Sequence, residues 1–300
     1  MGNKVLVTGC NGQLGVALQK IKPSDVEMLA LDRSKLDITN FSQVVDVVAS
    51  FNPDWIINAA AYTAVDKAES ESELAFLINR NGAENLARSA ESIGARLVQV
   101  STDYVFDGSQ GMPYKPDDQV NPINVYGESK LGGEIAVRKI LGDEALILRT
   151  AWVYAHHGKN FLTTMLRLMK ERKVLNVVED QIGTPTNAYT LADAIFSAIK
   201  NKSFGTHHWT DAGVASWYDF ANSIYESATA AKILTNRCHI APIPAEAYPT
   251  PAKRPVCSLL DKQSFRKCIN EDGDHWQNAL TRALDSIVRE GCSEINVSPR

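Results

Sequence analysis

The chain has 300 residues, of which 44% are hydrophobic and 22% are charged, a balance typical of a globular protein with a large core. Its formal net charge of −4 argues against a general nucleic-acid-binding protein, because phosphate backbones require a basic surface. No apolar run approaches the roughly 20 residues that cross a bilayer, and no segment has the pattern of a signal peptide. We therefore expect a cytoplasmic protein without membrane or nucleic-acid partners.

Short β-prone runs alternate with helix-length segments through the first half of the chain. The predicted strands are residues 5–7, 28–31, 55–58, 97–100 and 145–148. The predicted helices are residues 14–21, 41–51 and 71–93. The strand runs are short and bounded by turn or polar residues, as expected for strands buried on both faces. This alternation predicts right-handed βαβ crossovers and a doubly wound parallel sheet of the α/β class, Rossmann-like.

The second half is less regular and is predicted to be mixed α/β. Helices are expected at residues 160–172, 190–200, 217–231 and 276–289, with a strand at 174–178. Residues 241–255 carry five prolines and cannot form a continuous helix. We expect a dinucleotide-binding domain over residues 1–150, which parts of 174–210 rejoin, and a mainly substrate-binding lobe over 151–300.

A glycine-rich turn joins the first predicted strand to the first predicted helix. Its glycines have the spacing G-x-x-G-x-x-G. Glycine permits a tight turn and lets the backbone approach a diphosphate, while the helix N-terminus faces the anion. At the first βα turn of a βαβ series this pattern predicts a dinucleotide site, formed by Gly9, Asn11, Gly12, Gln13, Leu14 and Gly15.

The end of the second predicted strand bears on the choice of cofactor. Asp32 lies about 20 residues past the turn, where a carboxylate binds the adenosine ribose of NADH. Arg33 beside it suits the extra phosphate of NADPH, so the sequence permits either cofactor. Asp37 and Ile38 are expected near the adenine, although a plain loop explains them equally well.

The third predicted strand leads into a run of small residues. Such side chains at the carboxyl end of a parallel strand let a dinucleotide pass close to the backbone, although helix–sheet packing explains alanines as well. We assign this run to the cofactor: Ala60, Ala61, Tyr62 and Thr63.

The chemistry is predicted at Tyr126 and Lys130, which are four positions apart and share one face of a helix. Free tyrosine has a pKa of about 10, and we expect the nearby ammonium group to lower it toward the range of efficient proton transfer. Thr102, at the end of the fourth predicted strand, can donate to a substrate carbonyl oxygen. Together these groups predict reduction of a ketone by hydride, with Tyr126 supplying the proton.

The chain resembles the extended short-chain dehydrogenases, and within them the dTDP-4-dehydrorhamnose reductases, through nearly its whole length. The segments that carry the resemblance are residues 9–15, 58–69, 101–108, 125–131, 148–154, 180–186 and 254–258.

The resemblance implies that Tyr126 is the general acid, that Lys130 modulates it and binds the nicotinamide ribose, and that Thr102 binds the substrate carbonyl. The implied reaction is reduction of the C4 ketone of dTDP-4-dehydro-L-rhamnose to dTDP-L-rhamnose by NADPH or NADH, for surface polysaccharide. A nucleotide-sugar is therefore the expected small-molecule partner.

Four further residues are expected at the substrate. The resemblance implies that Asp103 and Trp152 contact the sugar, and it adds Val65 to the substrate site. Arg254 is our candidate for the diphosphate of the nucleotide, although a solvated basic loop is the alternative reading of that segment.

Other functions stay open at this point. Similar 4,6-dehydratases place an Asp-Glu pair after the active-site Thr, whereas Thr102 is followed by Asp103 and Tyr104, so elimination is disfavoured. Another nucleotide-sugar reductase, a 4-epimerase and a non-catalytic dinucleotide-binding regulatory subunit remain alternatives. The protein is expected to be a monomer or a homodimer.

No metal ligands are expected. Adjacent residues of an extended segment point to opposite sides, so neither His156-His157 nor His207-His208 chelates well. Some relatives are dimers bridged by magnesium through a carboxylate early in the first helix, and residues 16–18 offer none. The scattered cysteines lack metal or redox spacing and are expected to be reduced thiols: Cys10, Cys238, Cys257, Cys268 and Cys292.

Overall fold

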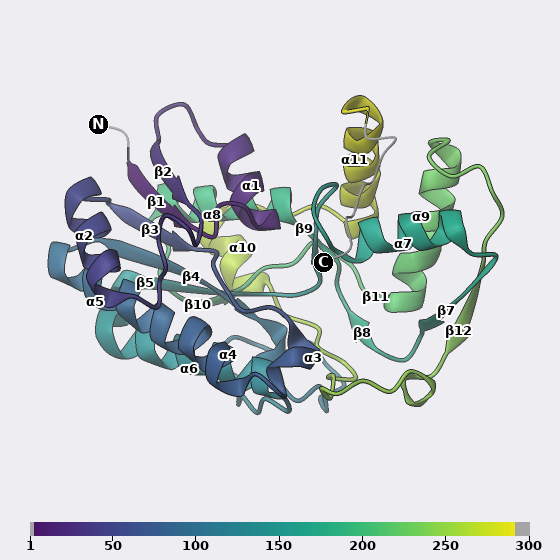
Figure 1. Ribbon diagram of the computed structural model, residues 1–300, viewed down its shortest axis with the longest axis horizontal. Helices are drawn as coiled ribbons and strands as arrows, with labels where there is room; N and C mark the ends of the chain where they lie inside the picture. Colours follow the sequence, from purple (N-terminus) through teal and green to yellow (C-terminus); the bar gives the residue numbers. More distant parts are fainter. Residues whose placement is uncertain (1–2, 292–300) are drawn as a thin grey trace.

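The structure is a computed structural model that describes residues 3–291, and its centre is a six-stranded parallel sheet (Figure 1). The strand order is β10-β5-β4-β3-β1-β2, which is the doubly wound α/β arrangement expected from the sequence. The five strands predicted from apolar runs are confirmed. The strands are β1 (Lys4–Thr8), β2 (Glu27–Leu31), β3 (Trp55–Asn58), β4 (Arg96–Thr102), β5 (Ala145–Thr150) and β10 (Gly205–His208).

Helices cover both faces of this sheet because alternate strand residues point to opposite sides. Val5 and Val7 belong to one buried cluster, which includes residues of α1 (Gln13–Lys20) and α8 (Ala188–Asn201). Leu6 belongs to another, on the opposite face. The helices of that second face are α2 (Phe41–Phe51), α5 (Gly82–Ile93) and α6 (Val125–Leu141). The short helix α10 (Gln263–Ile269) packs beside α8.

Short elements surround the carboxyl ends of the sheet. The helix predicted over residues 71–93 is interrupted by a π-helical turn between α4 and α5. The other short elements are α3 (Val65–Ala68), α4 (Ser72–Phe76), the π turn η1 (Leu77–Asn81), and the 3₁₀ turns η2 (Asp103–Val105), η3 (Gly142–Glu144) and η4 (Ala245–Ala247).

A second lobe with its own buried core lies beside the sheet (Figure 1). Its helices are α7 (Phe161–Glu171), α9 (Trp217–Ala230) and α11 (Trp276–Arg289). Strand β7 (Val174–Val178) pairs in parallel with β12 (His239–Ile243), which lies in the proline-rich stretch. Two further strand pairs are β6 (Val153–Tyr154) with β9 (Thr186–Asn187), and β8 (Ile182–Gly183) with β11 (Ala215–Ser216).

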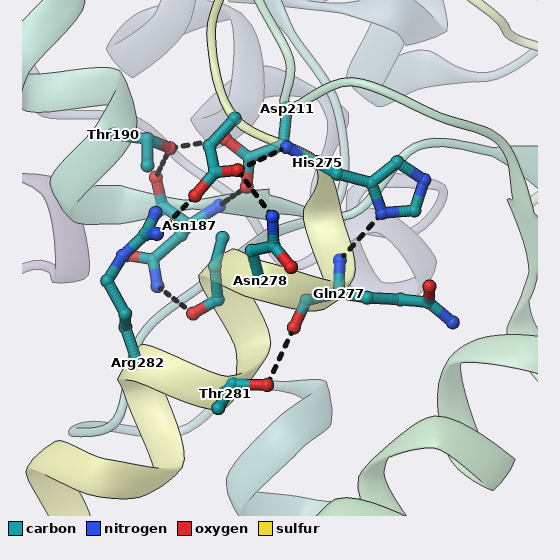
Figure 2. Close-up of polar contacts among 10 residues, drawn as sticks. Asn187, Thr190, Asp211, His275, Gln277, Asn278, Thr281 and Arg282 are labelled. Atoms are coloured by element: carbon teal, nitrogen blue, oxygen red, sulfur yellow. Dashed lines mark hydrogen bonds and ion pairs between the residues drawn. The ribbon is translucent and has the colours of Figure 1, made fainter.

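Asp211 joins the two parts of the molecule (Figure 2). Its buried carboxylate accepts hydrogen bonds from the Thr190 hydroxyl at 2.5 Å and the Asn187 backbone N–H at 2.9 Å. The Asn187 side chain donates in turn to the Ala279 carbonyl of α11 at 3.1 Å. Burial raises the pKa of Asp211 to about 6. This chain of polar contacts fixes α11 against the start of α8.

Among residues 3–291, no helix combines the length and the apolar character needed to span a membrane. The thiols of Cys10, Cys238, Cys257 and Cys268 are free, whereas Cys292 lies outside the described residues.

Candidate active site

A cleft of roughly 660 Å³ opens at the carboxyl ends of the parallel strands. This is the edge at which ligands bind in doubly wound sheets. The glycine-rich turn lines one part of the cleft, and Thr102, Tyr126 and Lys130 line another. Residues predicted separately as cofactor site and catalytic group therefore share one cavity.

The glycine-rich turn leaves no space for larger side chains. Gly9 has a φ of +68°, and a Cβ there would lie 2.8 Å from the Ala60 backbone. A Cβ on Gly15 would overlap the Gly9 carbonyl oxygen. Gly15 does not line the cleft, so its role is packing of α1 against the turn. The N-cap of α1, Gly12, has no side-chain cap, and its first turn holds no acidic residue, which suits a bound anion.

The charged residues after β2 differ in whether they line the cleft. Asp32 does not line the cleft. Its carboxylate accepts hydrogen bonds from Asn11 at 2.8 Å and from the Ser34 hydroxyl at 2.6 Å, which hold its pKa below the usual value, Ser34 most strongly. Arg33 does line the cleft, and 72% of its side chain is exposed. Asp37 also lines it and lies 3.8 Å from the Arg33 guanidinium.

The small residues after β3 line the cleft, but one predicted member does not. Ala60, Ala61 and Thr63 are lining residues, as is Ile38. The Tyr62 hydroxyl instead donates to Glu71 at 2.6 Å, outside the lining. This bond raises the pKa of Tyr62 to about 12.

Helix α6 carries Tyr126 and Lys130 into the cleft. The Asn124 side chain caps the helix by accepting from the Gly127 N–H at 2.8 Å, and Asn124 also donates to the Lys253 carbonyl at 2.7 Å. Gly127 is required here because a Cβ would overlap the Tyr104 carbonyl oxygen. This close contact brings the first turn of α6 against the end of β4.

The structure corrects the expected electrostatics of the pair. Burial raises the pKa of Tyr126 to about 12, although a hydrogen bond with Thr102 opposes the rise, and Lys130 is not among the groups that shift it. The Lys130 ammonium donates to the Val100 carbonyl at 2.7 Å. Burial lowers the pKa of Lys130 to about 8. Tyr126 is therefore a protonated phenol at neutral pH, which is the state a proton donor needs.

A buried ion pair lies behind Lys130. The Arg149 guanidinium binds Glu134 in a bidentate manner, at 2.9 and 2.7 Å. The Ser101 hydroxyl donates to the same carboxylate at 2.5 Å. The Glu134 charge raises the pKa of Lys130 and so opposes the effect of burial. Glu134 was not predicted from the sequence, although it lies four positions after Lys130 on the same helix.

Thr102, the last residue of β4, and Asp103, the first residue of η2, line the cleft. The Thr102 hydroxyl donates to Asp103 at 3.0 Å, and Ser258 donates to the other Asp103 oxygen at 2.5 Å. Burial raises the pKa of Asp103 to about 6, and these two hydrogen bonds oppose the rise. Ser258 thus connects the loop between η4 and α10 to the residue that follows β4.

Trp152 presents its indole to the cleft from a strained backbone. Its φ is +49°, an unusual value for a bulky residue. The ring stacks on Trp217 with centroids 3.5 Å apart. A Cβ on Gly183 would lie 2.6 Å from the indole, so glycine is needed there. Packing on these two sides fixes the ring.

Two predicted substrate residues lie outside the lining, Val65 and Arg254. The Arg254 guanidinium binds the Asp66 carboxylate at 3.0 and 2.9 Å and also donates to Thr250 at 2.5 Å. The side chains of Arg254 and Asp66 are 21% and 40% exposed. Arg254 is thus held by a carboxylate at the rim.

Several lining residues were not predicted from the sequence. They come mainly from the strand ends and from the loop before α7, and include Asn58, Ala59, Val100, Ser101, Thr150, Val153, His157, Gly158 and Lys159. Those after β3 and β4 lie in segments already singled out. Those of the loop before α7 come together with the glycine-rich turn only through the fold.

No group of three or more His, Cys, Asp or Glu side chains suited to a metal ion occurs within residues 3–291. His207 and His208 bind separate partners, the Ser264 hydroxyl at 3.0 Å and the Tyr114 carbonyl at 3.1 Å.

Comparison with known proteins gives the family. The family model described as RmlD substrate binding domain matches residues 3–289. The chain is 42% identical to a dTDP-4-dehydrorhamnose reductase of Aggregatibacter actinomycetemcomitans over 285 residues, which cover 92% of this chain and 97% of that protein.

Two solved structures agree with this match. A dTDP-4-dehydrorhamnose reductase from Clostridium acetobutylicum has a TM-score of 0.90 at 41% identity, covering 95% of this chain and 99% of that one. One from Bacillus anthracis, in complex with NADP, has a TM-score of 0.90 at 38% identity, covering 95% of this chain and 100% of that one. The chain belongs to the dTDP-4-dehydrorhamnose reductase family.

Proposed function

We propose that the chain reduces the C4 ketone of dTDP-4-dehydro-L-rhamnose to dTDP-L-rhamnose with hydride from NADPH, in dTDP-rhamnose biosynthesis. The observation that carries this proposal is one cleft lined by both the glycine-rich turn and Thr102, Tyr126 and Lys130, in a chain of this family. We further propose that the enzyme acts in the cytoplasm, where NADPH and nucleotide-sugars are made, as a monomer or a homodimer.

The residues present suit a dinucleotide. Gly9 and Gly12 line the cleft without side chains, and the uncapped N-terminus of α1 favours an anion there. Bound NADPH would supply the hydride, and Lys130 would hold its nicotinamide ribose.

NADPH is the better fit of the two cofactors. The Asp32 carboxylate is already engaged by Asn11 and Ser34, so it has little capacity left for ribose hydroxyls. The exposed Arg33 guanidinium lines the cleft and contacts Asp37 only at 3.8 Å. A planar guanidinium binds a phosphate well, and here that group is the 2′-phosphate.

The proton comes from Tyr126. As hydride adds to C4, the Tyr126 O–H bond breaks and the ketone oxygen becomes a hydroxyl. The raised pKa of Tyr126, about 12, keeps this proton in place until negative charge develops on the substrate oxygen. The Thr102 hydroxyl, which donates to Asp103 without substrate, turns to the same oxygen. Trp152 provides a fixed aromatic surface for the sugar.

Tyr126→Phe tests the proposal most directly. The substitution keeps the ring and removes only the acid, so we expect kcat to fall by about 10²- to 10⁴-fold. The assay uses the keto-sugar nucleotide as substrate and follows the loss of absorbance of the reduced nicotinamide at about 340 nm. Tyr218→Phe, on α9 of the second lobe, is the matched control and should retain full activity. Full activity in Tyr126→Phe would contradict the proposal.

The same assay separates the alternatives. A 4-epimerase returns its hydride to the substrate and consumes no net NADPH. A non-catalytic regulatory subunit consumes none either, and it binds a protein partner in stoichiometric amount. Steady loss of NADPH with formation of dTDP-L-rhamnose distinguishes the reductase from both.

A further inference from the structure

Trp152 lies where the chain leaves the central sheet for the second lobe. It stands between β5, which ends at Thr150, and β6, which begins at Val153. Its φ of +49° is a left-handed value that a bulky residue adopts only at a cost. Such a conformation persists where the surrounding structure leaves no alternative. The contacts of the Trp152 ring therefore have to offset this strain.

Two neighbours close on the Trp152 indole. The Trp217 ring stacks on it with centroids 3.5 Å apart and planes only 8° from parallel. On another side, a Cβ on Gly183 would lie 2.6 Å from indole Cε2 and 2.8 Å from Nε1, so the glycine backbone lies directly against the ring. The indole therefore cannot turn without displacing one of these two residues.

Both of these neighbours belong to the second lobe (Figure 1). Gly183 ends β8, which pairs antiparallel with β11. Trp217 follows β11 directly and is the first residue of α9, whose N-terminus is closed by a capping box. The Phe161 ring of α7 packs against Trp217 with centroids 4.7 Å apart. The orientation of Trp152 is therefore set by the second lobe.

Only one of the three residues reaches the cavity. Trp152 is partly exposed and lines the cleft, whereas neither Trp217 nor Gly183 is among its lining residues. We therefore expect any effect of Trp217 on a ligand in the cleft to act through the Trp152 ring.

We propose that Trp217 is a positioning residue, which holds the Trp152 indole in the orientation that receives the sugar of the nucleotide-sugar. A ring that is already fixed loses little freedom when the sugar binds, so the contact is not offset by an ordering cost. The second lobe thereby determines how tightly the sugar is held, without touching it through Trp217. The inference rests on the proposed function in taking a dTDP-sugar as the ligand and Trp152 as one of its contacts.

A purely structural role for Trp217 predicts a different pattern. The ring also packs against the apolar cluster of the second lobe, so its loss lowers stability under either role. General distortion of the lobe would weaken dTDP and a dTDP-sugar alike, because both occupy the same cleft. Only the positioning of Trp152 makes the loss specific for the ligand that carries a sugar.

Binding of two ligands to the NADPH-saturated protein tests the proposal. dTDP-L-rhamnose, the reduced product, cannot react with NADPH, and dTDP lacks the sugar. We expect Trp217→Leu to raise the Kd for dTDP-L-rhamnose about 3- to 10-fold, as expected when one side chain has to be ordered on binding, and to leave the Kd for dTDP unchanged. Trp217→Phe keeps an aromatic ring in the stack and should recover most of the affinity. The matched control is Phe41→Leu, which replaces a half-exposed ring of α2 outside the cleft lining and should change neither Kd.

Gly183→Ala tests the same ring from its other side. The added methyl group would overlap the indole, so Trp152 has to move while Trp217 is unaltered. We expect the same rise in the Kd for dTDP-L-rhamnose, again without a change for dTDP. With the keto-sugar nucleotide as substrate, KM should rise by the same factor and kcat should change less than about twofold, because Thr102 and Tyr126 lie on other elements. Thermal unfolding without ligand shows whether each variant folds, and Gly183→Ala carries the test if Trp217→Leu does not.

The outcomes separate this inference from the proposed function. An unchanged Kd for dTDP-L-rhamnose, an equal rise in the Kd for dTDP, or no recovery in Trp217→Phe overturns the role of Trp217 while turnover of the keto-sugar stands. The selective loss, together with no turnover by the unaltered protein, retains that role and rejects the reductase. Failure of the unaltered protein to bind dTDP-L-rhamnose rejects both.

Discussion

Two arginine–carboxylate pairs, Arg149 with Glu134 of α6 and Arg254 with Asp66 of α3, differ in burial. The side chains of Arg149 and Glu134 are 3% and 1% exposed, with a closest contact of 2.7 Å. Those of Arg254 and Asp66 are 21% and 40% exposed, with a similar contact of 2.9 Å. Distance alone therefore does not distinguish the two pairs, whereas access to water does.

Both members of the buried pair have further polar partners. Arg149 also donates to the Pro116 carbonyl at 3.1 Å and approaches His208 Nε2 at 3.4 Å. Glu134 also accepts from Ser101. A charge in such a place costs several kcal/mol to leave unpaired, so this pair stays closed and holds α6 to β4 and β5.

The more exposed pair joins the loop after η4 to α3, and solvent screens it more than the buried pair. Fully exposed pairs are worth about 0–1 kcal/mol, and we expect this partly buried pair to cost less to open than the buried one. From this difference we infer that Glu134 and Arg149 fix α6 and Lys130, and we propose that a substrate diphosphate can draw Arg254 away from Asp66.

Glu134→Gln is expected to have the largest effect. Glutamine has nearly the same shape but no charge, so the Arg149 guanidinium is left buried without its counter-ion. We expect a loss of about 3–5 kcal/mol in the free energy of unfolding, measured by urea denaturation. The control is Glu84→Gln, which removes the exposed ion pair with Arg88 on α5 and should cost less than about 1 kcal/mol.

Replacing both partners sharpens this test. In Glu134→Leu with Arg149→Met neither charge of this ion pair remains, and apolar replacements of similar volume are often neutral or stabilising. We expect the double variant to regain most of the stability lost in Glu134→Gln. If Glu134→Gln alone lost less than about 1 kcal/mol in the free energy of unfolding, the buried pair would contribute no more to stability than an exposed one.

The next largest expected effect is the change of the free energy of unfolding with pH that the titration of Lys130 causes. Its pKa is about 8 in the folded protein and about 10.4 in an unfolded chain. Between these values the unfolded chain binds more protons, so the free energy of unfolding increases with pH across that window. Because the Glu134 charge raises the pKa of Lys130, Glu134→Gln should move the lower edge of the window below pH 8.

The measurement compares urea unfolding from pH 6 to 10 in the Glu134→Gln variant and in the unaltered protein. The same measurement is made on Lys130→Met, alone and combined with Glu134→Gln. Subtracting the curve without Lys130 from the curve with it leaves the contribution of Lys130 to the pH dependence, free of other groups that titrate in the same range. An unchanged lower edge in Glu134→Gln would mean that Glu134 does not support the charge of Lys130.

The sequence predicted the sheet well where strands are apolar and missed it where they are not. Strands β1 to β5 follow from short runs of Val, Leu and Ile. Strand β10, Gly205–His208, reads Gly-Thr-His-His and has no such pattern. It pairs only with β5 at the edge of the sheet, where an apolar run on both faces is not required.

The site was predictable where its residues are close in the sequence. Spacing of four along one helix indicated Tyr126 and Lys130. Glu134 continues the same face, but a glutamate on a helix is usually exposed, and only its pairing with Arg149 of β5 shows that it is buried. Gln13 and the loop before α7 likewise line one cleft from distant segments, so no local pattern indicates that they come together.

Asp66→Asn should have the smallest effect and is the sharpest check of the exposed pair. The hydrogen bond from Arg254 lowers the pKa of Asp66 below its usual value. The stability from this group is therefore present above the unfolded pKa, about 3.9, and is lost as the pH falls through the lower folded pKa. At neutral pH we expect Asp66→Asn to lower the free energy of unfolding by less than about 1 kcal/mol, with Asp46→Asn on α2 as an exposed control.

The same variant should bind the substrate more tightly. Because Arg254 no longer has to leave a carboxylate, the KM for the nucleotide-sugar should fall about two- to fivefold, the equivalent of one exposed pair. A higher KM would mean that Asp66 positions Arg254 for the substrate rather than competing with it.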